Sequence, residues 1–146
     1  MASGEKDLGA LLRGMAPVLR AGSFVYCTFA NNEQPAGLRA LCTYDEAEGR
    51  SAIVEEEEAL RHGIPHRFRC ALITLNIHSE LAAVGFMSEV LGTLAALDIP
   101  CNVVSAYYHD HLFLPVDRAD EALTVLQRMS SGARPLGRLG PIQEAR

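Results

Sequence analysis

The sequence predicts an α+β fold in which antiparallel β-sheets carry helices packed on one face. The chain has 146 residues, of which 49% are hydrophobic and 21% charged, and this composition is typical of a globular protein. Residues 70–129 read as strand, helix, strand, strand, helix, which is the order of a split β-α-β unit with a ferredoxin-like arrangement. The N-terminal half is rich in predicted strands, and we expect it to form a smaller sheet of similar type.

In the N-terminal half, the spacing of apolar residues predicts a helix, three strands and a second short helix. Residues 7–18 carry leucines and a methionine at helical spacing, and the apolar run 24–29 reads as a strand. Residues 38–44 and 51–54 predict two more strands, joined by an acidic turn that contains glycine. A short helix is expected over 55–63, and its acidic first turn suits the helix dipole without any functional explanation.

The C-terminal half has a clearer pattern. Residues 70–77 alternate between apolar and polar side chains, which indicates a half-buried strand. Apolar residues then recur at helical spacing over 84–97. A β-branched strand over 99–108 and a returning strand over 112–116 are joined by a tight turn, and a last amphipathic helix covers 117–129.

These elements divide into an N-terminal module, residues 1–68, and a C-terminal module, residues 69–130, followed by a flexible tail, residues 131–146. No polar linker separates the modules. The C-terminal module lacks an obvious fourth strand of its own. We expect the N-terminal helix and the strand 24–29 to complete its sheet, so that the two halves are interlocked.

The charge pattern excludes several classes of partner. The chain has 13 basic and 18 acidic residues, a net charge of −5 and no basic run, so neither nucleic acid nor an anionic membrane is expected to bind it. The most apolar region, residues 81–97, contains Glu89 and is too short to span a bilayer. We expect no secretory signal at the N-terminus, because charged residues interrupt its apolar stretches, and the four cysteines form no C-x-x-C pair. These features predict a cytoplasmic protein with reduced cysteines.

Several stretches resemble a known family. Residues 85–90 followed by 94–99 are similar to the ACT-domain signature, in which a glycine starts the first helix. Residues 78–85 followed by 102–111 resemble a bacterial family of tandem ACT-like proteins, to which the ACT domains of cytosolic arginine sensors are related. The resemblance covers roughly residues 10–129. It implies a ferredoxin-like ACT tandem that binds an amino acid and regulates without catalysing a reaction.

The ligand site implied by this resemblance lies around the start of the first C-terminal helix. The candidate ligand-binding residues are His78, Ser79, Glu80, Val84, Gly85, Phe86, Asn102, Tyr108, His109 and Asp110. Gly85 either exposes helix-start amides to a carboxylate or merely permits close packing of the helix on the sheet. Ser79 and Glu80 either contact an α-amino group or cap the helix. Asn102, in an apolar strand, faces a ligand or bonds to neighbouring backbone.

Two other functions compete with this interpretation. His78, His109, Asp110 and His111 could form the site of a small metal-dependent enzyme or metal-binding protein, because imidazole and carboxylate groups suit zinc. The chain could also be a ligand-free assembly module that pairs exposed sheet edges. The favoured hypothesis includes no catalytic residue, no metal and no cofactor. It names a small molecule, an amino acid by class, as the partner, together with further copies of this chain.

Overall fold

A computed structural model describes residues 3–132 of the chain. The helices and strands, in chain order, are α1 (Leu8–Gly14), β1 (Pro17–Leu19), β2 (Phe24–Phe29), β3 (Ala40–Glu46), β4 (Gly49–Glu55), α2 (Glu56–Arg61), β5 (Arg67–Leu75), α3 (Phe86–Ala96), β6 (Asn102–Ser105), β7 (Asp110–Pro115) and α4 (Ala119–Ser130). Two short 3₁₀ helices, η1 (Ala30–Asn32) and η2 (Val116–Arg118), complete the order. None of the helices in residues 3–132 is long and apolar enough to cross a membrane.

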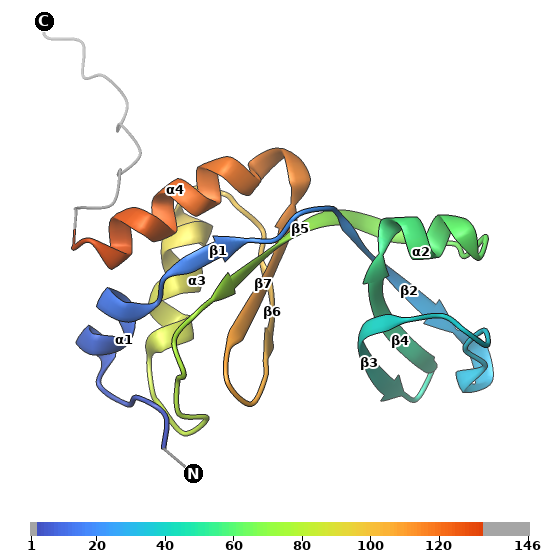
Figure 1. Ribbon diagram of the computed structural model, residues 1–146, viewed down its shortest axis with the longest axis horizontal. Coiled ribbons are helices and arrows are strands. Elements are labelled where there is room, and N and C mark those ends of the chain that lie inside the picture. Colours follow the sequence, from blue (N-terminus) through green and yellow to red (C-terminus); the bar gives the residue numbers. More distant parts are fainter. Residues whose placement is uncertain (1–2, 133–146) are drawn as a thin grey trace, which may run out of the picture.

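The strands form one antiparallel sheet that runs through both halves of the chain. Its order is β3-β4-β2-β5-β7-β6, and β1 also pairs with β5. Figure 1 shows β5 bridging the two halves, with α2 at one end and α1, α3 and α4 at the other. Every paired strand is antiparallel to its neighbour, which confirms the predicted fold class.

The N-terminal helix packs into the C-terminal half. Leu11 and Met15 of the α1 region are fully buried in the same apolar cluster as the core residues of α3 and α4. The helix ends earlier than predicted, because Ala16 takes a left-handed backbone conformation (φ 38°) and Pro17 begins a strand. That strand, β1, pairs with Ile73–Leu75 of β5.

The predicted interlocking is therefore present, but two N-terminal strands, β1 and β2, pair with β5, whereas we predicted this of the strand at 24–29 alone. β1 lies beside the end of β5, while β2 pairs with β4 along its whole length and with the start of β5. The sequence did not predict β1, since three residues are too few to show an alternating pattern. Both α1 and β1 lie within residues 1–68 and yet pack against the C-terminal half.

The two faces of the sheet differ in how they are covered. Helices cover one face: α1, α3 and α4 bury Ile73, Leu112 and Leu114, whereas α2 covers Val25 and Val54. On the opposite face a small cluster is buried with none of the described helices over it, formed by Phe24, Ile53, Cys70, Leu72 and Phe113. This arrangement confirms that the helices pack on one face. The predicted flexible tail lies outside the described residues, apart from Ser131 and Gly132.

Candidate functional site

A small cavity lies where the predicted ligand site was expected, at the start of α3. Its volume is about 150 Å³. The loop between β5 and α3 supplies Ser79 and Glu80, the first turn of α3 supplies Phe86, Met87 and Ser88, and the hairpin of β6 and β7 supplies Ser105 and Asp110. The chain thus brings together three segments that are far apart in sequence. We refer to this space as the α3 cavity.

Asp110 is the central polar residue of the α3 cavity. It opens β7, where its register partners are Leu75 of β5 and Ser105 of β6. Its side chain accepts hydrogen bonds from the hydroxyls of Ser79, at 3.0 Å, and Ser105, at 2.5 Å. Asp110 is only 5% exposed, but it lines the cavity. A carboxylate can accept about four hydrogen bonds, so acceptor capacity remains on the side that faces the cavity.

The charge of Asp110 is not matched by the protein. Among residues 3–132 the buried charged residues are Glu58 and Asp110. Glu58 is surrounded by the guanidinium groups of Arg39 and Arg61 and the imidazole of His62. Within the same range, no cationic side chain lies within 4.0 Å of Asp110, and none of the residues that line the α3 cavity is basic. Buried charges are normally paired, so this site is suited to a cation from outside.

Gly85 shapes the other end of the cavity. Its backbone is left-handed (φ 95°), a conformation that favours glycine, and a Cβ atom added there would lie 3.8 Å from Leu8. The backbone conformation, rather than close packing against the sheet, therefore requires this glycine. Among residues 3–132, no side chain caps α3. The capping interpretation of Ser79 and Glu80 is thus wrong: Ser79 bonds to Asp110 instead, and the first amides of α3 stay available to a ligand.

An aromatic cluster borders the site. The His78 ring lies 5.1 Å from Tyr108 and 6.3 Å from Tyr107, and both tyrosines are more than half exposed. Beside the cluster, a second cavity of about 180 Å³ shares Ser79 and Glu80 with the α3 cavity. The N-terminal segment closes this neighbouring cavity, because the Glu5 amide donates to the His78 carbonyl at 2.8 Å.

Five of the ten predicted residues do not line the α3 cavity, namely His78, Val84, Asn102, Tyr108 and His109. Val84 is 86% exposed, and the side chain of Phe86 belongs to the apolar core although the residue lines the cavity. Asn102 is exposed although its neighbours in the predicted strand are apolar, because β6 is an edge strand. It pairs with Phe113 and lies on the face without helices, in a different hollow. Ser105 lines the cavity but is not among the predicted residues, although the hairpin of β6 and β7 places it opposite Asp110.

The histidines do not converge on a metal site. The rings of His109 and His111 are 6.5 Å apart, while His78 packs on the tyrosines. Nδ1 of His111 shares a hydrogen bond with the hydroxyl of Thr74, at 2.9 Å, and burial lowers the pKa of this imidazole. No group of three or more His, Cys, Asp or Glu in the described part of the chain is placed to hold a metal ion. The metal hypothesis therefore has no geometric support there.

Comparison with known proteins decides the family. One model of the ACT domain matches residues 3–71, and a second matches residues 67–128. A protein of unknown function from Vibrio cholerae, described as a possible transport protein, is 36% identical, with a TM-score of 0.75 over 86% of this chain and 97% of that one. The chain belongs to the ACT-domain family. It carries two ACT domains in tandem.

This tandem ACT protein is also similar in fold to more distant structures. One is an Agrobacterium tumefaciens protein with 15% identity and a TM-score of 0.61, over 75% of this chain and 84% of that one. Another is the regulatory subunit of aspartate kinase from Thermus thermophilus, with 11% identity and a TM-score of 0.60, over 84% and 99%. At these identities the likeness concerns the fold alone. No curated protein matches the chain in sequence.

Proposed function

We propose that this tandem ACT protein is a non-catalytic regulatory protein that senses an amino acid bound in the α3 cavity. The observation that carries the proposal is Asp110, a buried carboxylate held by Ser79 and Ser105 that has no cationic partner within residues 3–132. An α-ammonium group would supply the missing charge and use the remaining acceptor sites of this carboxylate. Glu80 lines the same cavity and adds to its preference for a cation.

The other end of an amino acid fits the start of α3. The first turn of the helix has free backbone amides and no side-chain cap from the described part of the chain, and the helix dipole favours an anion there. A ligand whose ammonium lies on Asp110 and whose carboxylate lies on the amides of Phe86, Met87 and Ser88 would span the cavity. Its side chain would extend into the neighbouring 180 Å³ cavity, toward His78 and Tyr107.

The family and its structural neighbours support a regulatory role. The regulatory subunits of aspartate kinase from Thermus thermophilus and Thermus flavus share the fold of this chain. A regulatory protein transmits ligand binding to a partner through its two conformations. A ligand that binds one conformation more strongly shifts the conformational equilibrium towards it.

The two outer strands, β3 and β6, have unpaired edges within residues 3–132, and we propose that copies of the chain associate through them.

The four cysteines support a cytoplasmic location. Cys27 and Cys70 are buried, Cys42 and Cys101 are half-buried, and all four are free thiols. Burial raises the pKa of Cys70 and of Cys101 to about 11, so these thiols stay protonated and unreactive at neutral pH. Free, inert thiols are expected in a reducing compartment.

Isothermal titration of the full chain against each of the proteinogenic amino acids tests the proposal. We expect binding of at least one of them with a 1:1 stoichiometry per chain. The matched control is the corresponding amine that lacks the carboxylate, which should bind more weakly because it cannot use the α3 amides. A folded protein that binds none of the amino acids at millimolar concentration would contradict the proposed function.

A further inference from the structure

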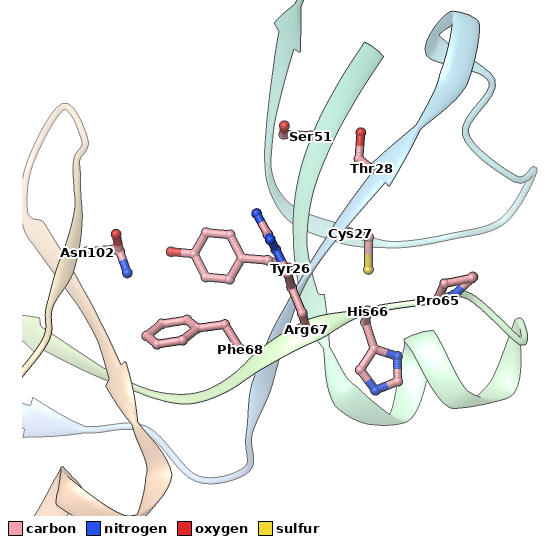
Figure 2. A pocket seen from close by; sticks show the side chains of 9 residues that line it. All are labelled: Tyr26, Cys27, Thr28, Ser51, Pro65, His66, Arg67, Phe68 and Asn102. Carbon is pink, nitrogen blue, oxygen red and sulfur yellow. The ribbon is translucent and has the colours of Figure 1, made fainter. Parts of the chain in front are cut away.

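A larger hollow lies away from the α3 cavity, on the face of the sheet that none of the described helices covers. Its volume is about 660 Å³, within the usual range for small-molecule pockets. Figure 2 shows the side chains that line it, which come from β2, β4, the loop before β5, the start of β5 and β6. We refer to this space as the sheet hollow. It spans the junction between the two halves of the chain.

The apolar wall of the sheet hollow is aromatic. The rings of Tyr26 and Phe68 meet edge to face with their centroids 5.7 Å apart, and Tyr26 also contacts Phe113 at 6.2 Å. Phe68 occupies a left-handed backbone conformation (φ 57°), which is unfavourable for a bulky residue. The register between β2 and β5 shifts at this point, so Phe68 lies in an irregular stretch of β5. Strained backbone of this kind is concentrated at functional sites.

The polar groups of the sheet hollow point to an anion. Arg67 lines it opposite Tyr26, its register partner. Arg69, on the same strand, forms an ion pair with Glu56, whereas the guanidinium of Arg67 makes no ion pair within residues 3–132. None of the nine lining residues is acidic. This charge pattern is the opposite of that in the α3 cavity.

Two neutral groups complete the site. In Figure 2 the hydroxyl of Tyr26 points toward Asn102, across the space beside the Phe68 ring. Burial raises the pKa of Tyr26 to about 12, so its hydroxyl is a neutral hydrogen-bond donor at physiological pH. Within the described residues, neither this hydroxyl nor the Asn102 side-chain amide is engaged with another side chain in a hydrogen bond. Both are free to bind a ligand's acceptor atoms.

We propose that the sheet hollow is a second binding site, for a small planar aromatic carboxylate. The aromatic ring would pack against Tyr26 and Phe68, and the carboxylate would lie on Arg67 within reach of Asn102. A guanidinium group binds a carboxylate through two parallel hydrogen bonds and also stacks on planar rings. The absence of acidic lining residues favours an acid without an ammonium group, so this ligand class differs from the amino acid of the α3 cavity. The inference does not rest on the proposed function.

The absence of tryptophan from the chain gives a direct test. Indole-3-acetate can be excited selectively in the presence of the protein, and its fluorescence anisotropy reports binding. Phenylacetate and 4-hydroxybenzoate are tested by calorimetry. We expect the full chain to bind at least one of these acids, and the neutral amide of the same acid to bind about tenfold more weakly.

Variants locate the binding. Arg67→Gln should weaken binding of the acid about tenfold and leave the amide almost unaffected, whereas Arg128→Gln, which removes an exposed arginine of α4, should change neither. Phe68→Gly relieves the left-handed strain and removes the aromatic wall, so it should keep the fold and lose binding. Asp110→Asn should bind the acid as the wild type does. Failure of all three acids to bind at millimolar concentration, or equal binding by Arg67→Gln and Arg128→Gln, would overturn the proposal.

Discussion

Ser79 donates a hydrogen bond to Asp110 at 3.0 Å, across 31 residues of sequence. This contact joins the loop before α3 to the hairpin of β6 and β7. It fixes the Asp110 carboxylate beside the free end of α3, so that acceptor and donor groups face one small cavity. The arrangement fits the proposed ligand, because the ammonium group of an amino acid would lie on Asp110 and its carboxylate would lie on the first amides of α3.

Substitutions at Asp110 and Ser79 separate the effect of the carboxylate charge from the effect of one of its hydrogen bonds. Asp110→Asn keeps the shape but removes the charge, so we expect the affinity for the amino acid to fall at least tenfold and the free energy of unfolding to fall by about 1–3 kcal/mol. Ser79→Ala is the matched variant: it removes one hydrogen bond and keeps the charge, so binding should persist within a few-fold. Calorimetry and urea unfolding measure both effects. Equal affinities of wild type and Asp110→Asn would rule out the anchor role.

Gly85 can be tested through its backbone conformation. Gly85→Ala forces an alanine into the left-handed region, and we expect a loss of about 1–2 kcal/mol of unfolding free energy. Gly92→Ala is the control in the same helix, at a position where nothing lies near an added Cβ atom. It should stabilise the protein by about 0.5–1 kcal/mol. Urea unfolding curves compare the two. Similar effects of both substitutions would show that the conformation of Gly85 is not what requires a glycine.

His111 makes stability depend on pH. Burial, followed by the nearby His109, lowers the pKa of His111 in the folded protein, so the unfolded chain takes up a proton at a higher pH than the folded one. The unfolded state then binds more protons between the two pKa values, and the folded state loses stability as the pH falls below about 6.5. His111→Asn should lose less stability than the wild type over that fall. Thermal melting at a series of pH values measures the difference, and parallel curves would contradict the prediction.

The N-terminal helix should be needed by the C-terminal half. A fragment of residues 65–146 lacks α1, β1 and β2, which exposes the partners of Leu11 and Met15 in the main core and leaves one edge of β5 unpaired. We expect a 65–146 fragment to be insoluble or to lack a cooperative thermal transition. Gel filtration and circular dichroism measure this. A soluble fragment that melts cooperatively would show that the two halves fold independently.

Much of the fold could be predicted from the sequence because apolar alternation and helical spacing are local signals. The strand at 24–29 has its predicted bounds in the structure, and the helix predicted over 84–97 forms α3. β1 could not be predicted, since its three residues become a strand only by pairing with β5. The division of the chain at residue 68 stays a prediction.

The candidate site was less predictable, because it depends on register and backbone geometry. The residues Ser79, Glu80, Gly85, Phe86 and Asp110 do line one cavity. Asn102 was misplaced, since an edge strand exposes a residue whose apolar neighbours suggest burial. The left-handed conformation of Phe68, which helps to form the sheet hollow, has no signal in the sequence, because phenylalanine does not favour it.

In the proposed binding mode, an amino acid bridges Asp110 and the start of α3. Backbone amide NMR of the full chain, recorded with each proteinogenic amino acid in turn, tests this binding mode. We expect at least one amino acid to shift the amide signals of Phe86, Met87 and Ser88 together with that of Asp110, and we expect the shifts at Phe86–Ser88 to disappear in Asp110→Asn. Signals at these positions that no amino acid moves, or shifts confined to other parts of the chain, would contradict it.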